Sequence, residues 1–270
     1  MTTARDLADL WDETSRAALA LVEQLSEDDL SLPTELPGWS VGDVVAHIAH
    51  LESVSAGMPQ PEGGSLTLPA EDGAQPITIS DVVEPGVAIR RGWTLAELLD
   101  ELRAACDARR VLLADADVDD PGIAAPGAFA VLGWPLKTVL TNRPFDLWVH
   151  EQDIRRATGR PIETESAGAA HAAAIFERAF PVALRRLPAG TSVVLDVTGP
   201  QGRVLAAEVG DDGRATPIEA PAEPSLRLVM DDATWLMLGA GRPDPTEVDV
   251  EITGDAELAA QVLRQLAVTP

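Results

Sequence analysis

Residues 36–51 read LPGWSVGDVVAHIAHL. The Pro-Gly pair marks a turn, and Ser40 and Asp43 beyond it have the spacing of a capping box, in which each side chain accepts a hydrogen bond from the other residue's backbone N–H. Apolar residues then recur three and four positions apart, which predicts an amphipathic helix. His47 falls on the apolar face of this helix and His50 at its edge. The stretch therefore predicts a core helix that carries an inward-facing imidazole.

Three more helical patterns accompany this one in the first 160 residues. The same spacing of apolar residues predicts helices over residues 7–25, 94–113 and 135–159. Pro144 is expected to kink or restart the last of them. Together with the helix after Ser40, they predict an up-down four-helix bundle.

Long connections separate the predicted helices. Residues 57–93 are rich in Gly, Pro and Glu, and we expect them to be mostly loop, with a short β-like run over residues 77–83. A second loop, rich in Pro and Gly, is expected around residues 121–133.

After residue 160 the pattern changes. A helix is expected over residues 167–187, and alternation of apolar and polar residues then predicts strands bounded by Gly, Pro or Asp. The predicted strands are residues 193–197, 203–209, 226–230 and 248–252, with helices at 231–238 and 255–266. Strands and helices that mix without strict alternation predict a small α+β domain with a mostly antiparallel sheet. We therefore expect two domains, residues 1–160 and 161–270.

The charge balance of the chain restricts its partners. Lys and Arg number 20 against 44 Asp and Glu, which gives a formal net charge of −24. A chain this acidic, with its arginines scattered, is repelled by a nucleic-acid backbone or an anionic membrane surface. The sequence has no run of 18 apolar residues and no secretory signal, so we expect no membrane-spanning helix and a cytoplasmic protein. The charge balance therefore predicts neither a nucleic-acid nor a membrane partner.

The polar residues of the last bundle helix point to one candidate site. Arg143, Asp146 and His150 fall on one inward stripe of the helix predicted over residues 135–159. A buried carboxylate needs a partner, and for Asp146 the candidates are a metal, Arg143 or His150. With His47 from the facing helix, two imidazoles and one carboxylate form the ligand set of a catalytic zinc site that keeps one position open. A hydrogen-bonded core histidine and an ordinary helix pair are the alternative.

The other reactive residue types are weaker candidates. The one cysteine, Cys106, excludes an intrachain disulfide and a thiolate zinc cluster, and it is expected to be a small buried apolar residue. His171 is expected at the surface or as a satisfied core histidine. A solvated charged face is expected from Glu151, Asp153, Arg155 and Arg156, with Asp153 closest to the inward stripe. The sequence contains neither a phosphate-binding Gly-rich loop nor a Gly-x-Ser-x-Gly elbow.

Segments of both predicted domains are similar to motifs of a known family. Residues 36–47 resemble the Pro-Gly-Trp-x-x-x-Asp-Val-x-x-His signature that opens the second helix in the mycothiol-dependent maleylpyruvate isomerase family, a branch of the DinB-like bundles. Residues 145–157, FDLWVHEQDIRRA, resemble the second metal-binding segment of that family. Gly241-Arg242 and residues 250–270 are similar to its small C-terminal domain, which is of the sterol-carrier type.

This resemblance implies a metal- and thiol-dependent enzyme. His47, Asp146 and His150 would bind a divalent metal, usually zinc, and the nucleophile would be mycothiol, whose sulfur occupies the open metal position as a thiolate. Such a thiolate supports cis–trans isomerisation or S-transfer. Arg143 would serve catalysis by clamping a carboxylate of the substrate or thiol, or it would form an ion pair with Asp146 or a nearby Glu. The chain departs from the family in one ligand, because Asp146 stands where the family has Glu, which changes the reach of the carboxylate and with it the metal distance, affinity or identity.

Two other functions fit the same residues. One is a non-catalytic metal- and ligand-binding module, which a closed four-ligand site that recruits His50 would favour. The other is a metal-assisted hydrolase, which would be active without an added thiol. The sequence indicates neither the substrate nor the oligomeric state.

Overall fold

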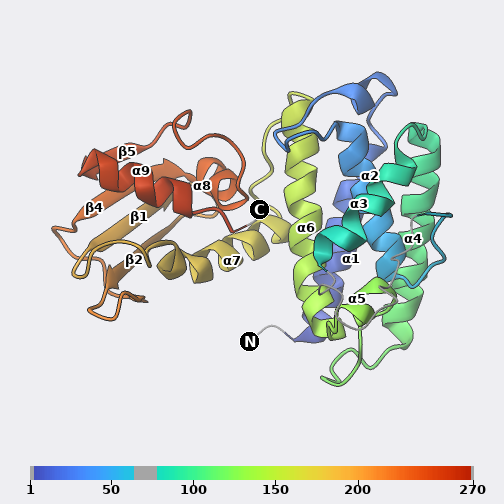
Figure 1. The fold of residues 1–270 in the computed structure, drawn as a ribbon, viewed down its shortest axis with the longest axis horizontal. Coiled ribbons are helices and arrows are strands. Elements are labelled where there is room, and N and C mark those ends of the chain that lie inside the picture. The colour runs from blue at the N-terminus through green and yellow to red at the C-terminus, as the bar shows by residue number, and fades with distance from the viewer. Residues whose placement is uncertain (1–2, 64–77, 269–270) are drawn as a thin grey trace, which may run out of the picture. The chain divides into compact units, whose positions relative to one another are not determined.

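The computed structural model describes residues 3–63 and 78–268. The chain divides into two compact units, residues 1–161 and 162–270 (Figure 1). The first unit is helical and the second contains a sheet, which confirms the predicted fold class. In the part of the chain that the structure describes, no helix is both long and apolar enough to cross a membrane.

Among the described residues of the first unit, four long helices form the main body. They are α1 (Ala4–Val22), α2 (Val41–Ser55), α4 (Leu95–Asp115) and α6 (Leu136–Ala157). Helix α1 packs against α6 and α4, and α2 packs against α4 and α6, which makes the predicted bundle (Figure 1). Shorter elements connect them: the 3-10 helix η1 (Asp28–Ser31) and the helices α3 (Ile79–Arg90) and α5 (Ala128–Val131).

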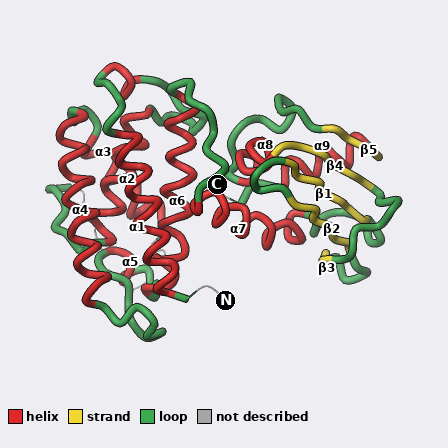
Figure 2. The backbone as a smooth tube through the Cα atoms, turned by 180° about the vertical axis from the view of Figure 1, so that it is seen from behind, coloured by secondary structure: helices red, strands yellow, loops and turns green. Residues whose placement is uncertain are grey.

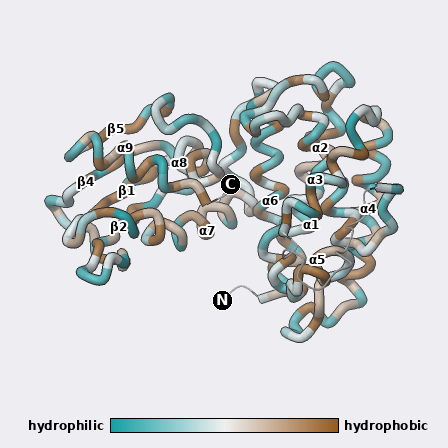
Figure 3. Tube along the Cα trace, viewed as in Figure 1, coloured by the Kyte–Doolittle hydropathy of each residue, from teal (hydrophilic) through white to brown (hydrophobic). Residues whose placement is uncertain are grey.

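Local sequence signals start these helices, and apolar faces hold them together. The capping box predicted for α2 forms, because Ser40 accepts from the Asp43 backbone N–H and the Asp43 side chain accepts from that of Ser40. Figure 3 shows polar and apolar residues alternating along the bundle helices. The apolar positions of α2, among them Val44, Val45 and Ile48, are fully buried. Burial of this face is what places His47 inside the unit.

Helix α3 corrects the prediction for residues 57–93. Residues 79–90 are helical, not loop with a β-like run over 77–83, of which residue 77 lies outside the described residues. The physical reason is a capping box between Thr78 and Asp81, followed by Val82 and other apolar residues that pack against α2. These local signals outweigh the Gly and Pro content on which the loop prediction rested.

Two smaller differences occur in the first unit. Pro144 lies inside α6, which runs through it as one helix rather than restarting. The short helix α5 lies within the loop expected around residues 121–133. At four residues, α5 is below the length at which helical periodicity can be recognised.

The second unit has one sheet of mixed direction. Its strands are β1 (Ser192–Thr198), β2 (Arg203–Val209), β3 (Ala215–Pro217), β4 (Leu226–Asp231) and β5 (Glu251–Gly254), in the order β3-β2-β1-β4-β5. The β1–β4 pair is parallel and the other three pairs are antiparallel, as the prediction of a mostly antiparallel sheet required. Figure 2 shows the strands side by side, and α7 (Ala167–Ala183), α8 (Asp232–Gly239) and α9 (Ala256–Gln265) contact them.

Two strands differ from the prediction, and in both cases the difference concerns where a strand forms or begins. Strand β3 was not predicted, since three residues are too few for alternation to be visible. Strand β5 begins at Glu251, not at residue 248, because its ladder with β4 extends only from Glu251 to Gly254. Alternation predicts an extended chain, whereas the ends of a strand depend on its partner.

Candidate metal centre

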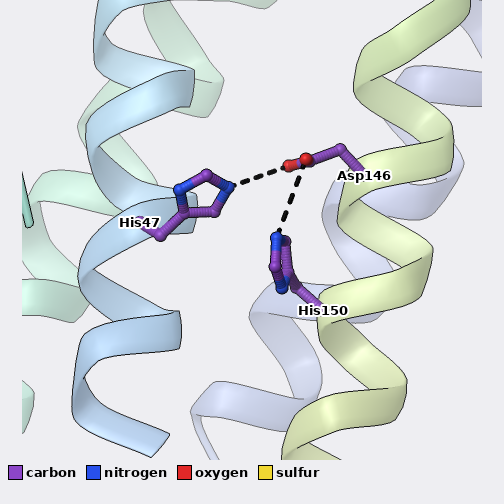
Figure 4. A group of neighbouring side chains, drawn as sticks. All are labelled: His47, Asp146 and His150. Atoms are coloured by element: carbon purple, nitrogen blue, oxygen red, sulfur yellow. Dashed lines mark hydrogen bonds and ion pairs between the residues drawn. The ribbon is translucent and has the colours of Figure 1, made fainter. Parts of the chain in front are cut away.

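The structure brings His47, Asp146 and His150 together inside the first unit. His47 comes from α2, and the other two come from successive turns of α6 (Figure 4). One ligand atom from each residue lies within 4.8 Å of the others. Both histidines are buried and Asp146 is half-buried. We call this group the candidate metal site.

Asp153 orients the imidazole of His150. The Nδ1 atom of His150 donates to Asp153 Oδ2 at 2.9 Å, so the ring presents Nε2 to the candidate metal site, 3.7 Å from Asp146 Oδ1. A carboxylate behind a histidine ligand fixes both the tautomer and the ring orientation. Asp153 was missed as a site residue, although its spacing of three from His150 was visible in the sequence.

The charged face expected for residues 151–156 is partly wrong. Glu151 and Asp153 are only 3% and 2% exposed. Glu151 accepts from Arg155 Nε at 2.8 Å, and Asp153 faces His150, so partners compensate the burial of both carboxylates. Of the four charged residues, the two carboxylates are therefore buried with partners, and Arg155 and Arg156 are half-buried.

His47 is incompletely satisfied. Its Nε2 atom lies 3.2 Å from Asp146 Oδ2, whereas Nδ1 is buried and has no hydrogen-bond partner among the described residues. Burial lowers the pKa of His47 to about 4, against the opposing effect of the Asp146 carboxylate. The imidazole is therefore neutral at neutral pH, which is the form that binds a metal.

Arg143 holds Asp146 in its anionic form. The Arg143 Nη1 atom donates to Asp146 Oδ2 at 2.6 Å. Burial alone would raise the pKa of the Asp146 carboxyl, but Arg143 and the two histidines hold that pKa well below its usual value. A permanently charged carboxylate suits a divalent cation.

The guanidinium of Arg143 is not presented to solvent. Its side chain is 0% exposed, and its Nε atom donates to Glu52 Oε1 at 2.9 Å. Of the two roles considered for Arg143, this geometry matches the ion pair with Asp146 and a nearby Glu, which is Glu52. A clamp on a substrate carboxylate would need an exposed face that Arg143 lacks.

The other predicted candidates lie elsewhere. The Nε2 atom of His50 donates to the Val82 carbonyl oxygen at 2.9 Å, so His50 does not join the candidate metal site. His171 is on α7 of the second unit. Cys106 is buried, and burial raises the pKa of its thiol to about 12, which excludes it as a thiolate nucleophile.

Trp39 lies against both imidazoles. Its ring centroid is 5.3 Å from that of His47 and 6.3 Å from that of His150, with which it stacks at 20°. The turn before α2 holds Trp39 in place, because its carbonyl oxygen accepts from the backbone N–H and the hydroxyl of Thr34. The half-buried indole thus forms one apolar wall of the site, a role that its position in the Pro-Gly-Trp turn did not reveal.

The three side chains fit a divalent metal. Ligand atoms about 2.0–2.1 Å from a tetrahedral ion are about 3.3 Å apart. Here His47 Nε2 lies 3.2 Å from Asp146 Oδ2, and His150 Nε2 lies 3.7 Å from the other oxygen, Oδ1. Zinc prefers donors of this kind, which are two neutral imidazoles and one carboxylate. A second carboxylate that accepts a hydrogen bond from one imidazole is also typical of zinc sites. With His50 excluded, the described residues would contribute three ligands to a bound metal, and a tetrahedral ion would then have one further position.

Comparisons with known proteins agree with the motifs in the sequence. The family model for the mycothiol maleylpyruvate isomerase N-terminal domain matches residues 11–155, more than half of the chain. The fold is similar to the crystal structure of the mycothiol-dependent maleylpyruvate isomerase, with a TM-score of 0.57 and 13% sequence identity over 95% of this chain and 98% of that one. A histidine-to-alanine mutant of that isomerase matches with a TM-score of 0.53 and 14% identity over the same shares. No curated protein matches the chain.

Proposed function

Since the chain belongs to the mycothiol maleylpyruvate isomerase N-terminal domain family, we propose that it is a metal-dependent enzyme with mycothiol as its thiol cosubstrate. The observation that carries this proposal is the candidate metal site, in which three protein ligands leave one position free. Zinc is the proposed metal, held by His47, Asp146 and His150. The reaction is a cis–trans isomerisation or a thiol S-transfer.

The residues around the site would prepare it for a thiol. A bound divalent metal would supply Lewis acidity, which stabilises a thiolate near neutral pH. Asp153 keeps the lone pair of His150 Nε2 directed at the site, and Trp39 shields both imidazoles on one side. Cys106 is buried and protonated, so the reacting sulfur must come from a small molecule.

Both reactions begin with attack by the sulfur of the thiol. In an isomerisation, the thiol sulfur adds to one carbon of an activated double bond, the resulting single bond rotates, and the sulfur leaves with its electron pair as the double bond forms again. In an S-transfer, the sulfur displaces a leaving group and stays on the product. Maleylpyruvate, on which the similar isomerase acts, is the first substrate to test for the isomerisation.

The two alternatives make different demands on the site. A structural metal in a binding module is expected to be closed by a fourth protein ligand, and His50, the nearest histidine on α2, is bonded to Val82 instead. A hydrolase would use water at the free position and need no thiol. Thiol dependence therefore separates the proposed enzyme from both.

The test combines metal content with thiol dependence. Protein purified without chelator is expected to contain one zinc per chain, and His150→Ala to contain none. Wild type is expected to convert maleylpyruvate, or to form a thioether from an electrophilic substrate, only when mycothiol is present. Absence of metal from the wild type, or turnover that is independent of thiol, would overturn the proposal.

A matched control comes from the same helix. His50→Asn changes a buried histidine of α2 that points away from the site, and it is expected to keep both zinc and thiol-dependent turnover. Equal loss of zinc in His50→Asn and His150→Ala would mean that the loss reflects damage to the bundle rather than removal of a ligand.

A further inference from the structure

The two oxygens of Asp146 are not equivalent. Oδ2 accepts from Arg143 Nη1 at 2.6 Å and lies 3.2 Å from His47 Nε2. Oδ1 faces His150 Nε2 at 3.7 Å and, among the described residues, accepts no hydrogen bond. Both oxygens therefore face a histidine of the candidate metal site, but Oδ2 is already engaged by the Arg143 guanidinium and Oδ1 is not.

Glu52 holds the guanidinium of Arg143 in this position. Its Nε atom donates to Glu52 Oε1 at 2.9 Å, and the side chains of Arg143 and Glu52 are both 0% exposed. Oε2 of Glu52 accepts from Arg109 Nη1 at 2.7 Å and from Trp11 Nε1 at 2.9 Å. All four long helices thus meet at one buried carboxylate, and displacement of Arg143 would leave charges without partners in the core.

The shape of arginine suits this bridge. The guanidinium directs Nε at Glu52 and Nη1 at Asp146, so one rigid group binds two carboxylates on different helices. A lysine ammonium is a single compact charge on a flexible stem and does not reproduce that fork. The contact with Asp146 is short and charge-assisted, which makes it one of the stronger kinds of hydrogen bond.

We propose that Arg143 is a positioning residue that restricts Asp146 to binding the metal through Oδ1 alone. A carboxylate can bind a cation through one oxygen or both, and the guanidinium on Oδ2 both occupies that oxygen and repels a second cation. Binding through one oxygen keeps a coordination position free for the thiol. Sharing the carboxylate charge with Arg143 also leaves the metal more electrophilic. This inference rests on the proposed metal site.

Cobalt substitution gives a readout that does not depend on turnover. The visible absorption of Co²⁺ is strong in four-coordinate sites and weak in sites with five or six ligands, so the spectrum reports the coordination number. Wild type loaded with Co²⁺ is expected to show the strong four-coordinate bands. Arg143→Gln is expected to lose much of this absorption, because Oδ2 becomes free to bind, and zinc-edge X-ray absorption is expected to show one more light-atom ligand.

Arg109→Gln is the matched control. It removes the other arginine on Glu52 without touching Asp146, so it is expected to lower thermal stability and leave the Co²⁺ spectrum unchanged. If Arg143→Gln does not fold, Arg143→Lys keeps a buried charge but not the fork, and the same spectral change is expected in part.

The outcomes separate this inference from the proposed function. A wild type that binds no Co²⁺ or zinc would overturn the metal site itself. A wild type that binds metal, with an unchanged spectrum and ligand number in the folded Arg143 variant, would overturn the role of Arg143 only. The same spectral change in Arg109→Gln would also overturn it, because the effect would then come from the core rather than from the contact with Asp146.

Discussion

Helix α2 carries two buried histidines one turn apart, and their surroundings are opposite. The Nε2 atom of His50 donates to the Val82 carbonyl oxygen at 2.9 Å, and its Nδ1 atom accepts from Arg90 Nη1 at 3.4 Å. His47 reaches Asp146 with one nitrogen, whereas the other is buried without a partner among the described residues. Burial is therefore common to a structural and to a candidate functional histidine. What differs is whether the protein completes the hydrogen bonds of the ring.

The His50 cluster (His50, Gln60, Arg90 and Glu101) is closed by the protein. Arg90 donates to Glu101 through Nε at 2.6 Å, makes a second contact to the same carboxylate through Nη2, and also donates to Gln60. Helix α3 fits onto His50 because residue 86 is glycine, whose missing side chain leaves room for the imidazole. This cluster connects α2, α3 and α4 through hydrogen bonds among the described residues.

Exchange of each histidine for asparagine is expected to separate the two roles most strongly. Zinc-finger sites bind with about 10–16 kcal/mol over four ligands, which is about 2.5–4 kcal/mol for each. His47→Asn is thus expected to weaken metal binding about 100- to 1,000-fold and to leave the fold intact. His50→Asn is expected to leave metal affinity unchanged and to lower the free energy of unfolding by about 1–3 kcal/mol, because partners of the ring are left unsatisfied.

Metal competition titrations and chemical denaturation of both variants measure these effects. A similar metal affinity in His47→Asn and wild type would remove His47 from the site. Loss of metal in His50→Asn at unchanged stability would mean that His50, and not His47, binds the metal.

The pH dependence of stability is the next largest difference. The pKa of His47 is about 4 in the folded metal-free protein and 6.5 as its ordinary value, so the unfolded chain takes up a proton first as the pH falls. The contribution of His47 is fully present above pH 6.5 and is lost as the pH falls toward 4, by about 3 kcal/mol. Burial lowers the pKa of His50 in the same direction, so both histidines add to the slope.

Denaturation of metal-free protein between pH 7 and 4 tests this expectation. His47→Asn lacks the titrating ring, and its stability is expected to fall less steeply over this range than that of the wild type. Parallel pH profiles of the two proteins would show that His47 is not protected from protonation by burial.

The contact between Gly86 and His50 offers a test of the His50 cluster alone. A Cβ atom on residue 86 would lie 2.1–2.3 Å from three atoms of the His50 ring. Gly86→Ala is therefore expected to destabilise the fold by about 1–3 kcal/mol. In a His50→Ala background the clash is absent, so the double variant is expected to lose less than the sum of the two single changes. Additive losses would show that α3 does not pack on His50 in this way.

Local signals explain which parts of the fold the sequence predicts. The capping boxes at Ser40 and Thr94 and the apolar spacing after them predict α2 and α4 with ends close to those observed. The same kind of box at Thr78 starts α3, but the Pro and Gly of residues 57–93 favoured a loop. Residues 57–93 thus combine a loop-like composition with a helix-capping signal, and the capping signal decides the structure of residues 79–90.

The candidate site is predictable only in part, because its support comes from distant residues. Helical periodicity places His47, Asp146 and His150 on inward faces, so their approach to one another could be anticipated. The role of Arg143 depends on Glu52, which lies on another helix and whose burial no local pattern shows. Such contacts are set by how helices pack, and helix packing is not encoded in the spacing of one helix.

The smallest expected effect concerns the carboxylate behind His150. Asp153→Asn retains an acceptor for His150 Nδ1 but removes the charge that raises the basicity of the ring, so metal affinity is expected to fall toward the lower end of the 10–100-fold range typical of such partners. Glu151→Gln is the control, because Glu151 is equally buried on the same helix but pairs with Arg155. Metal titrations of both variants are expected to show a loss in the first and none in the second. An equal loss in both would mean that the charge of the segment as a whole, and not the contact with His150, tunes the site; no loss in either would leave His150 oriented by helix packing alone.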